Sequence, residues 1–356
     1  MLSFLLLFLL HCSWRETRVF RGSTTDWKSD QIIYIVSKEK YKAICVMDID
    51  GQNVRELYRD YSKALQSGMA VSKDGKWLAF LRGNKNVPGT DCPYAAGIIN
   101  LLNLNDFTGR DIERKQLLLM SQPHYSWSPT RNQIAYTDFN WNVYIYDAET
   151  ETKRIVVAED SSPLSLYLPR WSPDGKRIAG VNVLGIYVID VNNPVPVPIN
   201  DIDEGLGPIE AMCWLSEQEL LFSYEGGGLF KINVATGEKV SINPLTTIDI
   251  ALSPDRQLIA AVQDSGIDIH EPSNIYVMKI DGSDHRNLAE QKGWNDNFNP
   301  CWSTDGTYIV FASTLHSWDR TRSEIYIMDA DGQNQKRLTF TEDGNCYNPT
   351  WVARRE

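Results

Sequence analysis

The chain has 356 residues and a formal net charge of −11, from 46 acidic and 35 basic residues. Hydrophobic residues make up 42% of the sequence and charged residues 23%, which excludes an intrinsically disordered chain and supplies enough apolar material for a large core. An acidic surface repels phosphate backbones, so we predict that nucleic acid is not a partner.

The N-terminal segment differs in composition from the rest of the chain. Residues 1–10, MLSFLLLFLL, are almost wholly apolar, a run too short to span a bilayer but typical of a secretory signal. No Lys or Arg precedes this run, and Cys12 follows it in a sequence that loosely resembles a lipoprotein cleavage box. We expect residues 1–20 to be a signal peptide or an N-terminal anchor. The protein is then exported, to the periplasm, the cell envelope or the extracellular space.

One segment recurs along the remaining chain. It reads WSPDGKRIAG from Trp171 and WSTDGTYIVF from Trp302, with related copies that begin at Val71, Trp127, Trp214, Leu252 and Trp351. In the Ser-Pro-Asp-Gly form, Pro fixes φ and Gly supplies a positive φ, which predicts a tight turn before a short apolar strand.

A second segment alternates with the first. It reads IYVMKIDG from Ile275 and IYIMDADG from Ile325, with further copies that begin at Ile44, Ile98, Val143, Ile186 and Leu229. Runs rich in Ile, Val and Tyr between Asp and Gly residues indicate strands joined by hairpins. A fourth short strand, such as residues 54–57, follows the hairpin. Each repeat is therefore predicted to be a four-stranded antiparallel meander, which at about 40–45 residues is typical of a β-propeller.

The two ends of the chain complete one further repeat. Trp351 begins a first strand, and residues 31–60 contain a second, third and fourth strand without a first. We predict an all-β fold in which residues 31–356 form a single seven-bladed β-propeller of four-stranded antiparallel blades. A blade shared between the N- and C-terminal strands closes the ring and removes its free edges. The repeated tryptophans are predicted to lie in the core between blades: Trp127, Trp171, Trp214, Trp302 and Trp351.

The patterns W-S-P-D-G-K-x-I-A-F and I-Y-x-M-D-x-D-G-x-x-x-R-L resemble the propeller repeats of the TolB family and related WD-like proteins, over about residues 31–353. The resemblance implies the propeller fold and a periplasmic setting. It implies little about function, because such repeats serve many roles. TolB has six blades behind a separate α/β domain, whereas seven blades are predicted here.

The spacing between the first and third strands predicts where a site lies. It is 15 or 16 residues in three repeats, but 27 in the repeat from Val71 and 23 in those from Leu252 and Trp302. The extra length falls in second-to-third loops, which lie on one face of the ring, and the extended blades form one arc. Long loops on a rigid scaffold commonly carry binding residues.

We predict that this arc binds a protein, a peptide or a saccharide, because exposed Trp, Tyr and Arg are typical of interfaces. The candidate contacts are Asp91, Tyr94, His270, Glu271, Trp294, Asn297, Phe298, His316, Trp318, Asp319, Arg320 and Tyr347. The alternative interpretation is that these loops pack on one another and cover the mouth of the channel.

Sequence motifs for catalysis are absent: there is no HExxH, no G-x-S-x-G and no Walker loop. We predict no catalytic residue, no metal and no cofactor, and a monomer that meets a membrane only through its N-terminal anchor. None of the six cysteines forms a CxxC pair, and an oxidising compartment would allow one disulfide whose pairing the spacing does not fix.

One enzymatic alternative remains open. The TolB-like propellers include oligogalacturonate lyase, which has a His-rich metal site. A similar site here would require His270 and His316 to converge with Asp264 or Asp319. A third alternative is an assembly scaffold without a small-molecule ligand.

Overall fold

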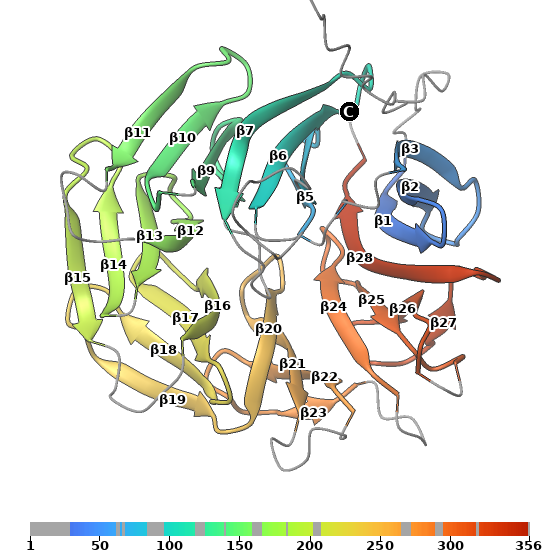
Figure 1. Cartoon of the computed structure of the whole chain (residues 1–356). Helices are drawn as coiled ribbons and strands as arrows, with labels where there is room; N and C mark the ends of the chain where they lie inside the picture. Colours follow the sequence, from blue (N-terminus) through green and yellow to red (C-terminus); the bar gives the residue numbers. More distant parts are fainter. Residues whose placement is uncertain are drawn as a thin grey trace, which may run out of the picture.

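Seven four-stranded antiparallel sheets form the blades of a ring, shown in Figure 1. The computed structural model describes residues 29–61, 65, 68–83, 96–117, 125–138, 140–158, 166–182, 184–201, 208–264, 272–288, 295–317 and 320–354. No helix within these ranges is long and apolar enough to cross a membrane.

The blades are numbered along the chain, and their strands are given from the inside of the ring outward. Blade 1 contains β28 (Gly344–Val352), β1 (Gln31–Lys38), β2 (Lys42–Asp48) and β3 (Arg55–Asp60). Blade 2 contains β4 (Ala70–Val71), β5 (Trp77–Gly83), β6 (Ala96–Asn103) and β7 (Gly109–Leu117). Blade 3 contains β8 (Tyr125–Trp127), β9 (Gln133–Thr137), β10 (Val143–Asp147) and β11 (Lys153–Val157).

The remaining blades repeat this order. Blade 4 contains β12 (Tyr167–Trp171), β13 (Arg177–Asn182), β14 (Gly185–Asp190) and β15 (Pro196–Asp201). Blade 5 contains β16 (Ile209–Trp214), β17 (Glu219–Tyr224), β18 (Leu229–Asn233) and β19 (Lys239–Asn243). Blade 6 contains β20 (Thr246–Leu252), β21 (Leu258–Asp264), β22 (Asn274–Lys279) and β23 (Arg286–Asn287). Blade 7 contains β24 (Asn297–Trp302), β25 (Tyr308–Ser313), β26 (Glu324–Asp329) and β27 (Lys336–Arg337).

Blade 1 closes the ring, as the sequence predicted. The C-terminal β28, red in Figure 1, pairs antiparallel with the N-terminal β1, with Trp351 opposite Ile32. Asp30 holds both ends together: one carboxylate oxygen accepts from Trp351 Nε1 at 2.9 Å and the other from the backbone N–H of Arg354 at 2.8 Å. The predicted all-β, seven-bladed fold with a shared blade is confirmed.

The Ser-Pro-Asp-Gly segments form the predicted tight turns between first and second strands. In blade 4, Ser172 Oγ donates to Asp174 at 2.5 Å and accepts from the backbone N–H of Arg177 at 2.9 Å. Gly175 in this turn has a φ of +69°, a conformation that favours glycine. These turns and the third-to-fourth hairpins lie on one face of the ring, called the turn face below. The second-to-third loops and the links between blades lie on the opposite face, called the loop face.

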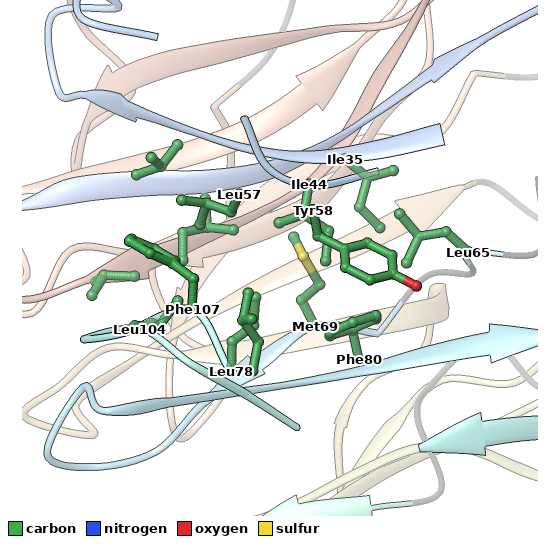
Figure 2. Close-up of a cluster of buried hydrophobic side chains, with 14 residues drawn as sticks. Ile35, Ile44, Leu57, Tyr58, Leu65, Met69, Leu78, Phe80, Leu104 and Phe107 are labelled. Atoms are coloured by element: carbon green, nitrogen blue, oxygen red, sulfur yellow. The ribbon is translucent and has the colours of Figure 1, made fainter. Parts of the chain in front are cut away.

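The core lies between neighbouring blades, where alternate strand residues face one another. Figure 2 shows the cluster between blades 1 and 2, in which Ile35 and Ile44 of blade 1 pack with Leu78 and Phe80 of blade 2. The rings of Tyr58 and Phe80 lie 4.9 Å apart, centroid to centroid. Burying one such side chain contributes about 1.5–3 kcal/mol, so the inter-blade layers supply most of the stability of the ring.

Candidate functional site

The predicted contact residues divide into two groups. One group lies outside the residues that the structure describes and stays a prediction: Asp91, Tyr94, His270, Glu271, Trp294, Trp318 and Asp319. The other group is described and lies on the loop side of blades 1 and 7: Asn297, Phe298, His316, Arg320 and Tyr347. These five residues come from β24, from the loop between β25 and β26, and from β28.

Arg320 is held by an ion pair with Asp296. Its Nη2 lies 2.6 Å from Asp296 Oδ1 and 2.7 Å from Oδ2, and its Nε lies 3.2 Å from Oδ2. Asp296 also accepts from the backbone N–H of Ser273 at 3.2 Å. This arrangement ties the β25–β26 loop to the link before β24, and it leaves Arg320 about 30% exposed at the surface.

Asn297 and Phe298 are the first two residues of β24. Asn297 is buried, and its side-chain amide donates to Asn274 Oδ1 at 3.2 Å across the boundary between blades 6 and 7. Phe298 and Tyr347 are half-buried and pack against the same apolar cluster. Lys42 Nζ lies 5.9 Å from the centre of the Tyr347 ring. Asn297 thus has a role in joining blades, and its predicted contact with a ligand remains untested.

His316 lies beside a buried acid. Both of its ring nitrogens are buried and have no hydrogen-bond partner among the described residues, and Nε2 lies 4.0 Å from Glu324 Oε1. Burial lowers the pKa of His316, and the nearby Arg337 and Arg322 lower it further against the opposing charge of Glu324. The imidazole is therefore neutral at pH 7.

The carboxylate of Glu324 accepts hydrogen bonds from groups other than His316. This carboxylate is fully buried and accepts from Arg337 Nη2 at 2.9 Å and from Thr339 Oγ1 and the backbone N–H of Thr341. Within the described ranges, no three His, Cys, Asp or Glu side chains gather closely enough to hold a metal ion. The metal site of the enzymatic alternative would need His270 together with His316, and His270 lies outside those ranges, as does Asp319.

A groove opens between blades 1 and 7 where blade 7 is narrow. The outermost strand β27 has only two residues, whereas β3 in blade 1 has six. The face of blade 1 is therefore left partly uncovered. The resulting blade 1–7 groove has a volume of about 370 Å³ and is lined by Tyr34, Val36, Lys38, Tyr41, Ala43, Cys45, Val54, Glu56 and the segment 340–343.

Apolar side chains at this groove are unusually exposed. Phe340 is 73% exposed, the highest value among the large apolar side chains of the described residues. The Arg337 guanidinium lies 4.6 Å from the centre of the Phe340 ring and holds it in place. Val54 is 55% exposed, so the groove offers two apolar surfaces to solvent at once.

An arginine stacked on tyrosines lies beside the groove and contacts its lining residue Tyr41. The Arg59 guanidinium lies 4.2 Å from the centre of the Tyr41 ring and 5.8 Å from that of Tyr61. It also pairs with Glu56, Nε to Oε1 at 2.8 Å, which raises the pKa of Arg59. Lys38 Nζ lies 2.7 Å from Asp343 and joins the two sides of the groove. Two ion pairs thus border the groove, and the Tyr41 ring is held by Arg59 before any ligand arrives.

Sequence reasoning missed these groove residues. Tyr41 lies in a short hairpin of a blade whose loops are not extended, and Phe340 lies in a blade link of ordinary length. The signal that was available was an isolated Phe in a polar link, TFTEDG from Thr339, with no partner in the repeat pattern.

The closed ring of seven four-stranded sheets defines the class of this protein, a seven-bladed β-propeller. No protein-family model matches the chain. An oligogalacturonate lyase in complex with manganese is similar over 88% of this chain and 86% of that chain, with a TM-score of 0.58 and 12% identity. The β-propeller domain of Cps50 (Swd1) from Myceliophteria thermophila is similar over 78% of this chain and 89% of that chain, with a TM-score of 0.54 and 14% identity.

A protein assigned as TolB from Agrobacterium tumefaciens is also similar, over 94% of this chain and 99% of that chain, with a TM-score of 0.45 and 16% identity. The similarity to the lyase and to Cps50, at such low identity, concerns the fold alone.

Proposed function

We propose that this protein is a non-catalytic, exported, TolB-like β-propeller that binds a segment of another protein or a peptide in the groove between blades 1 and 7. The observation that supports this most is the blade 1–7 groove, which is lined both by the exposed Phe340 and by Tyr41, the ring on which Arg59 stacks.

The composition of the groove favours a polypeptide ligand. Tyr and Arg are over-represented among the residues that dominate binding energy at protein interfaces, and a central apolar patch with a polar rim is their usual setting. Here Phe340 and Val54 supply the apolar surface, and the Lys38–Asp343 and Arg59–Glu56 pairs supply the rim. Because the rim charges are already paired, a ligand would gain most from covering the apolar groups.

Site-specific photo-crosslinking tests this proposal. A benzophenone amino acid at position 340 should give a discrete adduct in the intact cell envelope, and the same group at position 197 should not. Val197 is a matched control because it is 54% exposed on β15, an outer strand of blade 4 away from the groove. An Arg59→Ala substitution should weaken the adduct at position 340 at least fivefold.

The adduct also reports the class of ligand. An adduct that a protease digests supports a polypeptide, whereas one that resists protease and carries sugar would correct the ligand to a saccharide. Equal adducts at positions 340 and 197, or none at 340, would contradict the proposal.

Metal analysis of the wild type and of a His270→Ala/His316→Ala variant tests the enzymatic alternative, which requires stoichiometric metal that the variant loses.

A further inference from the structure

Three of the inner strands that form the wall of the central channel have a β-bulge. Leu168, Asn299 and Asn348 lie in the inner strands β12, β24 and β28, and their φ angles are +56°, +51° and +51°. Each is followed by a proline, and the pairing register shifts at each of these places. Such bulges redirect side chains and are frequent beside binding sites. In β24 and β28 they occur at asparagine, which adopts this conformation more readily than other side chains do.

The bulges border a pocket in the channel. It has a volume of about 400 Å³ and is bounded by residues of six inner strands, among them Trp127, Arg170, Asp249, Asn299 and Asn348. This volume lies within the range of about 300–1,000 Å³ that is usual for small-molecule sites. Among the described residues that line it, only Arg170 and Asp249 are charged, and their charges are opposite.

The walls of this channel pocket are fixed by hydrogen bonds, two of which join neighbouring blades. Arg170 donates through Nε to the Met212 carbonyl at 3.0 Å and through Nη1 to the Pro169 carbonyl at 3.0 Å. Trp127 Nε1 donates to the Ala70 carbonyl at 3.0 Å. A ligand would therefore meet a preformed surface and would lose little free energy to ordering it.

Asn348 is the residue that points to a ligand. It is only 8% exposed, and its Nδ2 is buried without a hydrogen-bond partner among the described residues. A buried donor without a partner costs about 1–3 kcal/mol. Asn348 lines the pocket together with Asn299, so two carboxamides border it, and a small rotation of the Asn348 side chain would bring its unpaired Nδ2 to a ligand.

We infer that the channel pocket binds a small, neutral, polyhydroxylated molecule of the size of a monosaccharide. Carboxamides can donate to hydroxyls or accept from them, and a carboxylate can accept from them, so Asn299, Asn348 and Asp249 supply polar contacts for such a ligand. A lining without net charge favours a neutral ligand over an anion or a cation. This site is separate from the blade 1–7 groove and does not depend on the function proposed for that groove.

Saturation-transfer NMR tests this inference with named probes: glucose, galactose, mannose and sorbitol, and succinate as the charged comparison. At least one neutral probe should give a signal with the wild type, and succinate should give none. The signal should fall at least tenfold in Asn348→Asp, which replaces the donor, and in Asn348→Gly, which removes the side chain and tolerates the positive φ.

The matched control is Asn334→Gly. Asn334 has a φ of +54° but lies in the exposed turn between β26 and β27, so this variant should keep the signal. Phe340→Ser in the blade 1–7 groove should also keep it. If Asn348→Gly fails to fold, Asn299→Gly tests the neighbouring amide at the same φ. Three results would overturn the inference: no signal from any neutral probe, a signal from succinate alone, or a signal that the Asn348 variants leave unchanged.

Discussion

Arg337 joins a buried acid to an exposed aromatic ring: its Nη2 donates to Glu324 Oε1 at 2.9 Å, and its guanidinium lies 4.6 Å from the centre of the Phe340 ring. Glu324 is fully buried at the start of β26, whereas Phe340 follows β27 on the surface. The position of the groove aromatic is thus set by an electrostatic contact inside blade 7.

Arg337→Ala should destabilise the protein by about 3–5 kcal/mol, because it leaves the Glu324 carboxylate buried without its counter-charge. Denaturant unfolding followed by circular dichroism measures this. Arg286→Ala, on the equivalent short strand of blade 6 where the side chain is exposed, should change the free energy of unfolding by less than about 0.5 kcal/mol. Equal effects of the two substitutions would show that the ion pair contributes nothing.

The repeated tryptophans should respond differently to replacement by phenylalanine. Trp302 Nε1 donates to the Ala251 carbonyl at 3.1 Å, whereas Trp171 Nε1 is buried with no partner among the described residues. Trp302→Phe should therefore cost about 0.5–1.5 kcal/mol more than Trp171→Phe, because only the former removes a hydrogen bond. The comparison needs only two melting curves, and a larger cost for Trp171→Phe would be the opposite of this expectation.

Stability should fall on mild acidification, in part through His316. Its pKa in the folded state is lowered, chiefly by burial, from an unfolded value of about 6.5. Above that value the imidazole is neutral in both states. As the pH falls below about 6.5 the unfolded chain takes up the proton first, so folding stability decreases until the folded-state pKa is passed.

The free energy of unfolding, measured at pH 7.5 and at pH 5.5, should therefore drop less in His316→Gln than in the wild type. Part of the drop should persist, because burial also lowers the pKa of His285. An identical drop in variant and wild type would mean that folding does not change the pKa of His316.

The four described cysteines should be unreactive in the native protein. Cys45, Cys213, Cys301 and Cys346 are free thiols, and burial raises the pKa of Cys45, Cys213 and Cys346 to about 12. In a Cys12→Ser/Cys92→Ser background, their reaction with a thiol reagent at pH 8 should be at least about a hundredfold slower than in guanidinium chloride, since the thiolate is the reactive form. Rapid labelling of even one thiol without denaturant would contradict this.

The architecture could be predicted from sequence because its signals are local. Each blade repeats a turn such as Ser172–Gly175 and a hairpin such as Asp329–Gly332, and these motifs fix strand order without knowledge of distant contacts. Even the shared blade followed from counting strands at the two ends of the chain. The fourth strand of blade 1, expected over residues 54–57, is observed at Arg55–Asp60, because pairing with β2 continues to Lys42.

The candidate sites depend on contacts that no local pattern encodes. Tyr41 and Phe340 line the same groove only because blade 1 is shared and β27 is short. Asn348 follows the repeat pattern as an ordinary strand residue, and its unused donor is evident only from its burial. Asn297, by contrast, was selected as a loop residue, but it begins β24 and faces Asn274.

The closure of blade 1 also has a consequence in time. Trp351 and Asp30 lie 321 residues apart, so at roughly 5–20 residues per second a ribosome needs about 16–64 s to synthesise the chain between them. Throughout that interval the inner edge of β1 has no strand to pair with and is open to wrong partners. Because the first sheet is complete only when β28 has been synthesised, a factor that delays folding until then would protect the unpaired edge of β1 from aggregation.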